Sequence, residues 1–260
     1  MKLLFIRHGD PDYEKDALTE KGKKEAMLLS NMIDTFGIDD VYQSPLGRAK
    51  ETASYSLSKL GKEAVTYEWL KEFPAVFDPN LSESARQAYE NELVFNKETG
   101  KYDGRILWDV LPSYYAKHQD IFDPVKWRES EIVKCSNMVP IYDEVVSEFE
   151  KLLADYGYVR DDRIFRVKEG NDKVVAFFCH FGITCVLLSY LWQISPFTLF
   201  QYLAAAPTSV TEVVSEERQK GIAIFRTLRI GDITHLTMGQ DMPSFSARFC
   251  EKYENEDERH

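Results

Sequence analysis

The chain has 260 residues, of which 44% are hydrophobic and 13% aromatic, enough to bury the core of one large α/β domain or of a domain with an insertion. Its formal net charge of −11 argues against nucleic acid as a partner, because nucleic acid is bound through a basic face. No membrane span or signal peptide is expected, and the cysteines form no CxxC pair or zinc pattern, so reduced thiols and a cytoplasmic location are predicted.

Strands and helices alternate along the first part of the chain. An apolar strand is predicted at residues 3–6, and a helix follows from Thr19, which can cap it, to Gly37, which can end it. A short strand in "DDVYQSP" stops at Pro45, and a second helix runs from about residue 48 to 60, before a strand near 65–67. Such alternation predicts a parallel sheet that is covered on both faces.

The alternation stops between about residues 74 and 134. This stretch combines prolines, charges and several aromatic residues, and it is too long for an ordinary loop. We expect an inserted, mainly helical cap, whose aromatic residues form its own small core. A long helix near 141–156 and the strand "VVAFFC" then resume the core, and the helix "ITCVLLSYLW" and two further strands follow.

The predicted architecture is therefore a three-layer α/β/α fold with a mostly parallel central sheet. It forms a single domain over residues 1–260, with a core of about 1–73 and 135–245, a cap insertion of about 74–134 and a polar C-terminal tail at 251–260.

Three of the predicted strands end in polar residues. One ends in Arg7 and His8, one in Ser44 with Arg48 just beyond it, and one in His180. Because ligands bind at the carboxyl ends of parallel strands, we expect these groups to share one edge of the sheet. Arginine gives bidentate donors to a phosphoryl group, and an imidazole can attack phosphorus to form a phosphohistidine. A carboxylic acid is then needed to protonate the leaving alkoxide.

Four stretches carry a resemblance to a known family: "RHGDPDY", "LTEKGKKEA", "SPLGRAKETA" and "FFCHFGIT". In this order they resemble the signatures of the histidine phosphatase superfamily, in its phosphoglycerate mutase-like branch. The resemblance implies that His8 is the nucleophile, that Arg7 and Arg48 bind phosphate, and that His180 completes the pocket for both catalysis and phosphate binding. It also implies a general acid in an L-x-E context, which here is Glu72.

The identity of the general acid stays open, because Asp10, Glu51 and Glu83 compete with Glu72. Thr184 has two possible roles as well, as a donor to phosphate or as a helix cap. The remaining histidines are expected to be ordinary structural residues: His118, His235 and His260.

Two departures from the family pattern concern activity and substrate. Glu14 stands where members with the mutase pattern have asparagine, which favours a phosphatase over a mutase. Phe181 interrupts the usual His-Gly-Gly stretch, and we expect it to narrow or reshape the pocket.

The leading hypothesis is a metal-independent phosphomonoester hydrolase, a histidine acid-base phosphatase without a cofactor. The alternatives are a phosphoglycerate mutase-type phosphoryl transferase and a non-catalytic phosphate-binding regulatory module. The expected partner is a small phosphorylated substrate, with neither nucleic acid nor membrane. The physiological substrate and the oligomeric state stay open.

Overall fold

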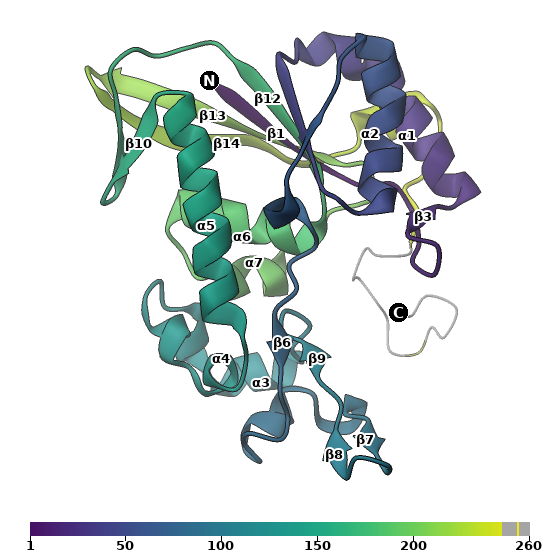
Figure 1. The fold of residues 1–260 in the computed structure, drawn as a ribbon, viewed down its shortest axis with the longest axis vertical. Coiled ribbons are helices and arrows are strands. Elements are labelled where there is room, and N and C mark those ends of the chain that lie inside the picture. Colours follow the sequence, from purple (N-terminus) through teal and green to yellow (C-terminus); the bar gives the residue numbers. More distant parts are fainter. Residues whose placement is uncertain (246–253, 255–260) are drawn as a thin grey trace. The chain divides into compact units, whose positions relative to one another are not determined.

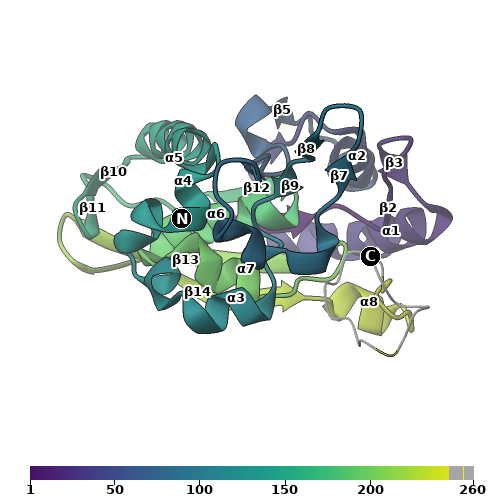
Figure 2. The same cartoon turned by 90° about the horizontal axis from the view of Figure 1, so that it is seen from below.

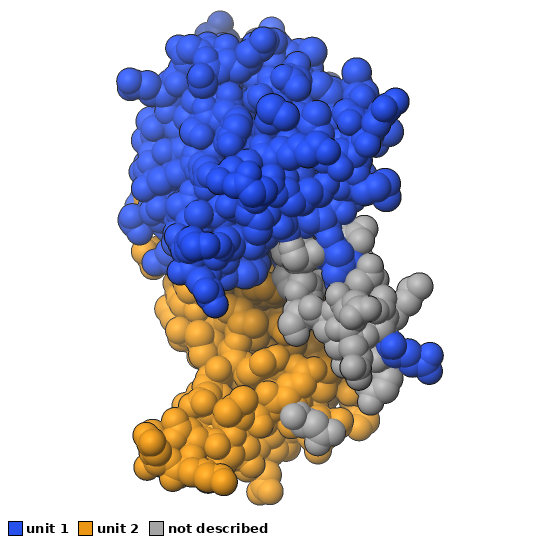
Figure 3. Space-filling view, turned by 90° about the vertical axis from the view of Figure 1, so that its right-hand side faces the viewer, with its two compact units in different colours: residues 1–72, 150–184, 204–260 blue, residues 73–149, 185–203 orange. Residues whose placement is uncertain are grey.

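The computed structural model describes residues 1–245 and Glu254. The chain divides into two compact units, coloured in Figure 3, and the predicted cap of residues 74–134 lies within the second. The predicted tail at 251–260 lies outside the described residues, apart from Glu254. Unit 1 comprises Met1–Glu72, Glu150–Thr184 and Ala204–His260, and unit 2 comprises Phe73–Phe149 and Cys185–Leu203.

Unit 1 is built around an eight-stranded sheet in the order β10-β11-β14-β13-β1-β12-β4-β5 (Figure 1). Its strands are β1 (Lys2–Arg7), β4 (Asp40–Gln43), β5 (Val65–Thr66), β10 (Tyr158–Asp161), β11 (Ile164–Val167), β12 (Val174–Cys179), β13 (Val210–Gln219) and β14 (Ile222–Asp232). A two-stranded ribbon follows β1 and consists of β2 (Pro11–Asp12) and β3 (Ala17–Leu18).

The sheet is mixed, whereas a mostly parallel sheet was expected. The pairs β1–β12, β12–β4 and β4–β5 are parallel, and the four other neighbouring pairs of described strands are antiparallel. For two of the antiparallel pairs the reason is local: β10 and β11 are joined by a tight turn that contains Asp162 at φ 52°, and β13 and β14 by one that contains Gly221 at φ 79°. Turns this short connect only antiparallel strands.

Helices cover one face of this sheet. α1 (Glu20–Met32) and α2 (Gly47–Leu60) lie side by side in Figure 1, and α8 (Thr234–Met238) lies beside α1 in Figure 2. The Thr19 hydroxyl accepts from the Gly22 N–H at 3.0 Å, so the predicted cap of α1 is confirmed. The 3₁₀ turns of unit 1 are η1 (Ile33–Phe36), which ends at Gly37 with φ 64°, and η2 (Glu68–Leu70).

Alternate residues of the central strands explain the core of unit 1. Leu4 and Ile6 of β1 pack with Ala176 and Phe178 of β12 in a cluster that includes Leu29 of α1. The residues between them in these strands are buried as well. Burial on both faces explains why these strands are runs of apolar residues rather than alternating ones.

Unit 2 contains short helices, single 3₁₀ turns and two small strand pairs, β6–β9 and β7–β8. Within it Tyr115 packs against Phe122, but Trp127 packs edge-on against Tyr142 and Phe197, which lie outside residues 74–134. The cap aromatic residues therefore form a core, but they share it with α5 (Met138–Asp155) and α7 (Pro196–Tyr202) rather than forming one of their own. The unit boundary falls inside α5 and α6 (Phe181–Trp192). Its other elements are β6 (Val76–Phe77), η3 (Ala85–Ala88), η4 (Glu90–Glu92), β7 (Phe95–Asn96), β8 (Lys101–Tyr102), β9 (Arg105–Ile106), α3 (Pro112–Lys117), η5 (Gln119–Phe122), η6 (Lys126–Glu129) and α4 (Glu131–Lys134).

None of the described helices has the length and apolar character that a membrane span requires.

Candidate active site

The carboxyl ends of β1, β12 and β4 lie next to one another, because β1 and β4 pair in parallel with the two sides of β12. The backbone pairing continues one residue past the strands. His8 N–H donates to the Cys179 carbonyl at 3.0 Å, and Ser44 N–H donates to the Phe178 carbonyl at 2.9 Å. His180 follows β12 directly, so the structure brings the polar strand ends to one edge of the sheet, as the sequence predicted.

His8 is buried and its imidazole has a defined proton position. Nδ1 lies 2.7 Å from the Gly9 carbonyl oxygen. Because a carbonyl only accepts hydrogen bonds, the proton is on Nδ1, and Nε2 keeps its lone pair. Burial, and then the positive charge of Arg7, hold the pKa of His8 well below its usual value, so the ring is neutral at neutral pH. This is the form of imidazole that can attack phosphorus.

The turn after His8 requires a glycine because the backbone of α1 approaches it closely. A Cβ added to Gly9 would lie 2.8 Å from the Gly22 carbonyl oxygen. The Gly9 N–H donates to the Thr52 hydroxyl of α2 at 2.9 Å. The loop that carries His8 is therefore fixed against both helices.

His180 faces His8, with ring centroids 5.0 Å apart and planes inclined at 56°. Its Nε2 lies 2.7 Å from the Ser44 hydroxyl, which also accepts from the Leu46 N–H at 3.2 Å. Burial, and then the charge on neighbouring groups, lower the pKa of His180 well below its usual value. If the Ser44 hydroxyl donates to Nε2, the proton of this neutral ring is on Nδ1, a buried atom with no hydrogen-bond partner among the described residues.

Arg7 is buried at the same edge, with its guanidinium over the ring of Phe181. The distance from Arg7 Cζ to the ring centroid is 5.6 Å, and Arg7 Nη1 donates to the Ala205 carbonyl. Phe181, which was expected to narrow or reshape the pocket, is itself buried and provides the packing surface of this guanidinium.

Arg48, in the first turn of α2, is held by a residue from the β2–β3 ribbon. Its Nη1 donates to Asp16 Oδ1 at 2.7 Å, and the Gly47 N–H donates to Asp16 Oδ2 at 2.6 Å. The ring of Tyr13 lies 5.3 Å from Arg48 Cζ. Asp16 therefore caps α2, which has no capping side chain of its own, and fixes one arm of the arginine.

Glu72 contacts the first turn of α6, the helix that begins directly after His180. Its Oε1 accepts from the Ile183 N–H at 3.3 Å, and its side chain is half-buried. Among the competing acids, Glu51 Oε2 accepts from the Leu18 N–H at 2.7 Å, next to the β2–β3 ribbon. Glu83 belongs to unit 2.

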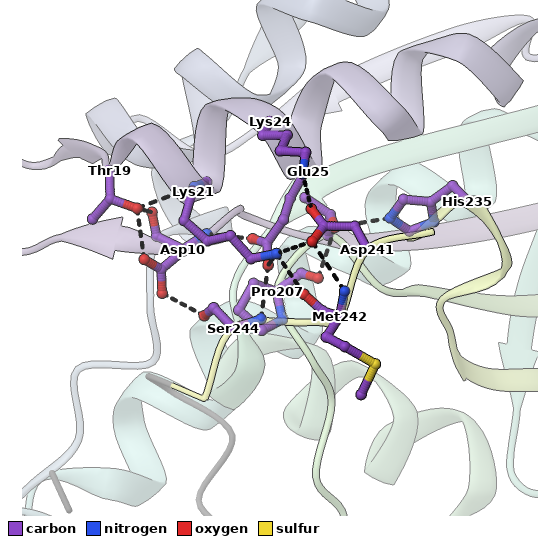
Figure 4. A network of polar contacts seen from close by, with 12 residues as sticks. Asp10, Thr19, Lys21, Lys24, Glu25, Pro207, His235, Asp241, Met242 and Ser244 are labelled. Carbon is purple, nitrogen blue, oxygen red and sulfur yellow. Dashed lines mark hydrogen bonds and ion pairs between the residues drawn. The ribbon is translucent and has the colours of Figure 1, made fainter. Parts of the chain in front are cut away.

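The third competing acid, Asp10, belongs to the network in Figure 4. Its Oδ2 accepts from the Thr19 hydroxyl at 2.6 Å, and its Oδ1 accepts from the Ser244 hydroxyl. The Asp10 N–H donates to Glu25 Oε2 at 3.0 Å, and Glu25 Oε1 accepts from the Ser244 N–H at 2.9 Å. Both oxygens of Asp10 therefore tie the loop after His8 to neighbouring segments, which gives this carboxylate a structural role.

Thr184 makes a contact that neither of its expected roles requires. Its hydroxyl donates to the His180 carbonyl at 2.7 Å, one turn back along α6. This bond uses the hydroxyl proton, so Thr184 has none left for phosphate in this structure. Thr184 is not the N-cap either, because it lies inside α6 rather than before it.

Sequence reasoning assigned no role to Asp16, Tyr13 or Glu25. It identified Ser44 only as the end of a strand, although the serine–proline pair there could have marked Ser44 as a candidate site residue. For Asp16 there is no comparable signal, because its partner lies 32 residues away.

Comparison with known proteins shows which proteins this chain resembles. Residues 3–102 match the family model of the histidine phosphatase superfamily (branch 1). A probable phosphatase from Schizosaccharomyces pombe is 23% identical over 250 residues, which cover 91% of this chain and 95% of that protein.

Solved structures share the fold. A mutant phosphoserine phosphatase from Entamoeba histolytica, in complex with phosphoserine, aligns with a TM-score of 0.56 and 18% identity over 90% of this chain and 98% of its own. A mycobacterial glucosyl-3-phosphoglycerate phosphatase, in complex with inorganic phosphate, aligns with a TM-score of 0.54 and 15% identity over 90% of this chain and 98% of its own. At such identities the likeness shows the fold alone. The α/β class is confirmed, and so is the resemblance of this chain to the histidine phosphatase superfamily.

Proposed function

We propose that this protein is a metal-independent phosphomonoester hydrolase that acts through a covalent phosphohistidine on His8. The observation that carries the proposal is the state of that imidazole, which is buried and neutral with its proton fixed on Nδ1. His180 and two arginines at the same sheet edge support it, since together they match a phosphoryl dianion. The related proteins named above carry the names of a probable phosphatase and of a phosphoserine phosphatase.

In the first step the lone pair on His8 Nε2 forms a bond to phosphorus while the bond from phosphorus to the ester oxygen breaks. The departing alkoxide takes a proton from Glu72, the proposed general acid. Arg7 and Arg48 donate to the phosphoryl oxygens. His180 donates from Nδ1 to the same group, and therefore stabilises the charge that moves onto it.

In the second step water attacks the phosphohistidine. Glu72, now a carboxylate, accepts a proton from the water while the water oxygen forms a bond to phosphorus. The bond from phosphorus to Nε2 breaks, its electron pair returns to His8, and inorganic phosphate leaves. The two steps restore both residues to their starting states.

The substrate class proposed is a small phosphorylated compound. Phosphoserine and glucosyl-3-phosphoglycerate, which appear in the names of the related structures, belong to this class. The mutase alternative has no specific support, since Glu14 stands in place of the mutase asparagine. A cytoplasmic location and the absence of a cofactor stay predictions.

The test is to trap the phosphoenzyme. Wild-type protein is mixed with a labelled phosphomonoester in excess EDTA and quenched in alkali or in acid. Protein-bound label should survive the alkaline quench and be lost in acid, because phosphohistidine is acid-labile. His8→Asn should carry no label and show no turnover, whereas the control His118→Asn, in unit 2, should behave as wild type. Turnover by His8→Asn, or label that survives acid, would exclude the mechanism. Wild-type protein that binds phosphate without turnover would favour the regulatory module.

A further inference from the structure

The turn before β13 contains a strained residue. The Ser209 N–H donates to the Ala206 carbonyl at 3.1 Å, which closes a β-turn with Pro207 and Thr208 at its centre. Thr208 has φ 59°, in the left-handed region. A turn with proline first and a positive φ second ordinarily has glycine or asparagine at the second position, and a β-branched residue there is an outlier. Something must hold Thr208 in this conformation.

The strained residue contacts the nucleophile directly. The Thr208 N–H donates to the His8 carbonyl at 3.1 Å, on one side of the His8–Gly9 peptide. On the other side, the Gly9 N–H donates to the Thr52 hydroxyl at 2.9 Å. The next carbonyl, that of Gly9, accepts from His8 Nδ1. The orientation of the imidazole, and thus the direction of its Nε2 lone pair, depends on how this peptide is held.

His235 holds the side chain of Thr208. The Thr208 hydroxyl donates to the Pro207 carbonyl at 2.7 Å, and His235 Nε2 lies 2.8 Å from the same hydroxyl oxygen. Since the single hydroxyl proton is used, Nε2–H of His235 must be the donor. His235 is buried on α8, and burial lowers its pKa to about 4, so the ring is neutral. Figure 4 shows the ring directed toward the turn of Pro207.

We propose that His235 is a positioning residue for His8, and that it acts through Thr208. Its Nε2–H pins the threonine hydroxyl, the pinned residue stays in the left-handed region, and the N–H of that residue then holds the His8 carbonyl. The sequence predicted only a hydrogen-bonded structural role for His235. This inference rests on the proposed function, because it explains the direction of the His8 Nε2 lone pair, which matters only if His8 is the nucleophile.

A matched pair of variants tests the donor. His235→Gln keeps an N–H near the position of Nε2, and His235→Met has a similar shape without a donor. In single-turnover experiments, well below the melting temperature of each variant, His235→Met should form phosphoenzyme about 10- to 100-fold more slowly, the range expected when a reacting group is displaced by a fraction of an ångström to 1 Å. His235→Gln should stay within about threefold of wild type. The Kd for inorganic phosphate should change little in either. Equal rates for the two variants would overturn the proposal.

A second substitution tests the route through Thr208. Glycine adopts a positive φ without strain, so the turn should keep its shape in Thr208→Gly even without the hydrogen bond from His235. We expect Thr208→Gly to be nearly as active as wild type, and His235→Met/Thr208→Gly to regain most of the rate that His235→Met loses. A double variant as slow as His235→Met would overturn the route. An inactive wild type would refute the proposed function instead, so the two failures are distinguishable.

Discussion

Asp16 and Arg48 form an ion pair in which the carboxylate also caps the helix that carries the arginine. Asp16 Oδ1 accepts from Arg48 Nη1 at 2.7 Å, while Oδ2 accepts from the Gly47 N–H at 2.6 Å. A Cβ on Gly47 would lie 2.1 Å from the Asp16 carbonyl oxygen, so the ribbon reaches α2 only because this residue is glycine. One carboxylate therefore fixes both the helix start and one arm of the guanidinium.

Asp16→Asn should lower kcat/KM about tenfold, in line with the loss of a charge-assisted hydrogen bond. Asparagine suits this test because Asp16 has φ 48°, a conformation that asparagine tolerates, so the change removes charge and leaves the backbone unstrained. Steady-state kinetics with Asp12→Asn as control measure the effect, since Asp12 lies on the same ribbon and its carboxylate pairs with Lys15. A rise in kcat/KM would mean that Asp16 competes with the substrate for Arg48.

Ser44→Ala should reduce kcat on the order of tenfold or more, with a smaller effect on KM. The hydroxyl contacts His180 Nε2, and without it nothing in the described site fixes which ring nitrogen carries the proton. Ser54→Ala, on the exposed side of α2, is the control, because its hydroxyl donates to the Glu51 carbonyl within the same helix. Unchanged kcat in Ser44→Ala would show that the tautomer of His180 is set in another way.

The local signals of the sequence predicted the polar sheet edge well. Arg7 ends a buried strand, and His8 and His180 each follow one directly; strands of this kind are recognisable from their own residues. Thr19 is a comparable case, since a helix cap is a property of a few adjacent residues. The structure places these residues as expected because the information lies within one short stretch in each case.

Contacts between distant segments of the chain could not be predicted from the sequence. Ser44 meets His180 across 136 residues, and Thr208 meets His235 across 27. No pattern in one chain specifies such pairs, because the sheet order that brings them together is itself not local. The antiparallel pairs β1–β13 and β11–β14 escaped prediction for the same reason, since no tight turn joins them and their direction depends on which strands become neighbours.

His8 and His180 should both be neutral at pH 6, because burial and neighbouring positive charge lower each pKa well below the ordinary value of 6.5. Histidine-selective ¹⁵N NMR measures this directly, and it should also place the proton of His8 on Nδ1. His8→Asn and His180→Asn variants assign the signals. A His8 ring that is protonated at pH 6 would contradict the state that the proposed mechanism requires.

Glu25→Gln should change how the free energy of unfolding depends on pH. Burial raises the Glu25 pKa to about 7 from an ordinary value of 4.5. The folded state therefore binds more protons than the unfolded state between these values, and this contribution to stability is present below pH 4.5 and lost as pH rises through about 7.

Relative to wild type, Glu25→Gln should therefore gain about 2 kcal/mol in free energy of unfolding between pH 5 and pH 8, because glutamine does not titrate. Urea unfolding at the two pH values measures it, and Glu20→Gln, exposed on the same helix, should show no such gain. A gain of the opposite sign would mean that the hydrogen bonds from Asp10 N–H and Ser244 N–H keep the buried carboxylate ionised.

Glu72→Gln tests the proposed general acid by comparing leaving groups. Its Oε1 accepts from the Ile183 N–H, a contact that the amide oxygen of glutamine can keep, so the variant removes mainly the transferable proton. An alkyl phosphate releases a basic alkoxide and should react at least about 10²-fold more slowly, whereas p-nitrophenyl phosphate releases a stable phenolate and should lose far less of its rate.

Single-turnover kinetics isolate the first step from phosphoenzyme hydrolysis, in which the same carboxylate is the proposed base. Glu68→Gln, exposed four residues earlier, should match wild type on both substrates. Equal losses on the two substrates would make Glu72 structural, and Glu83 would then be the acid to test.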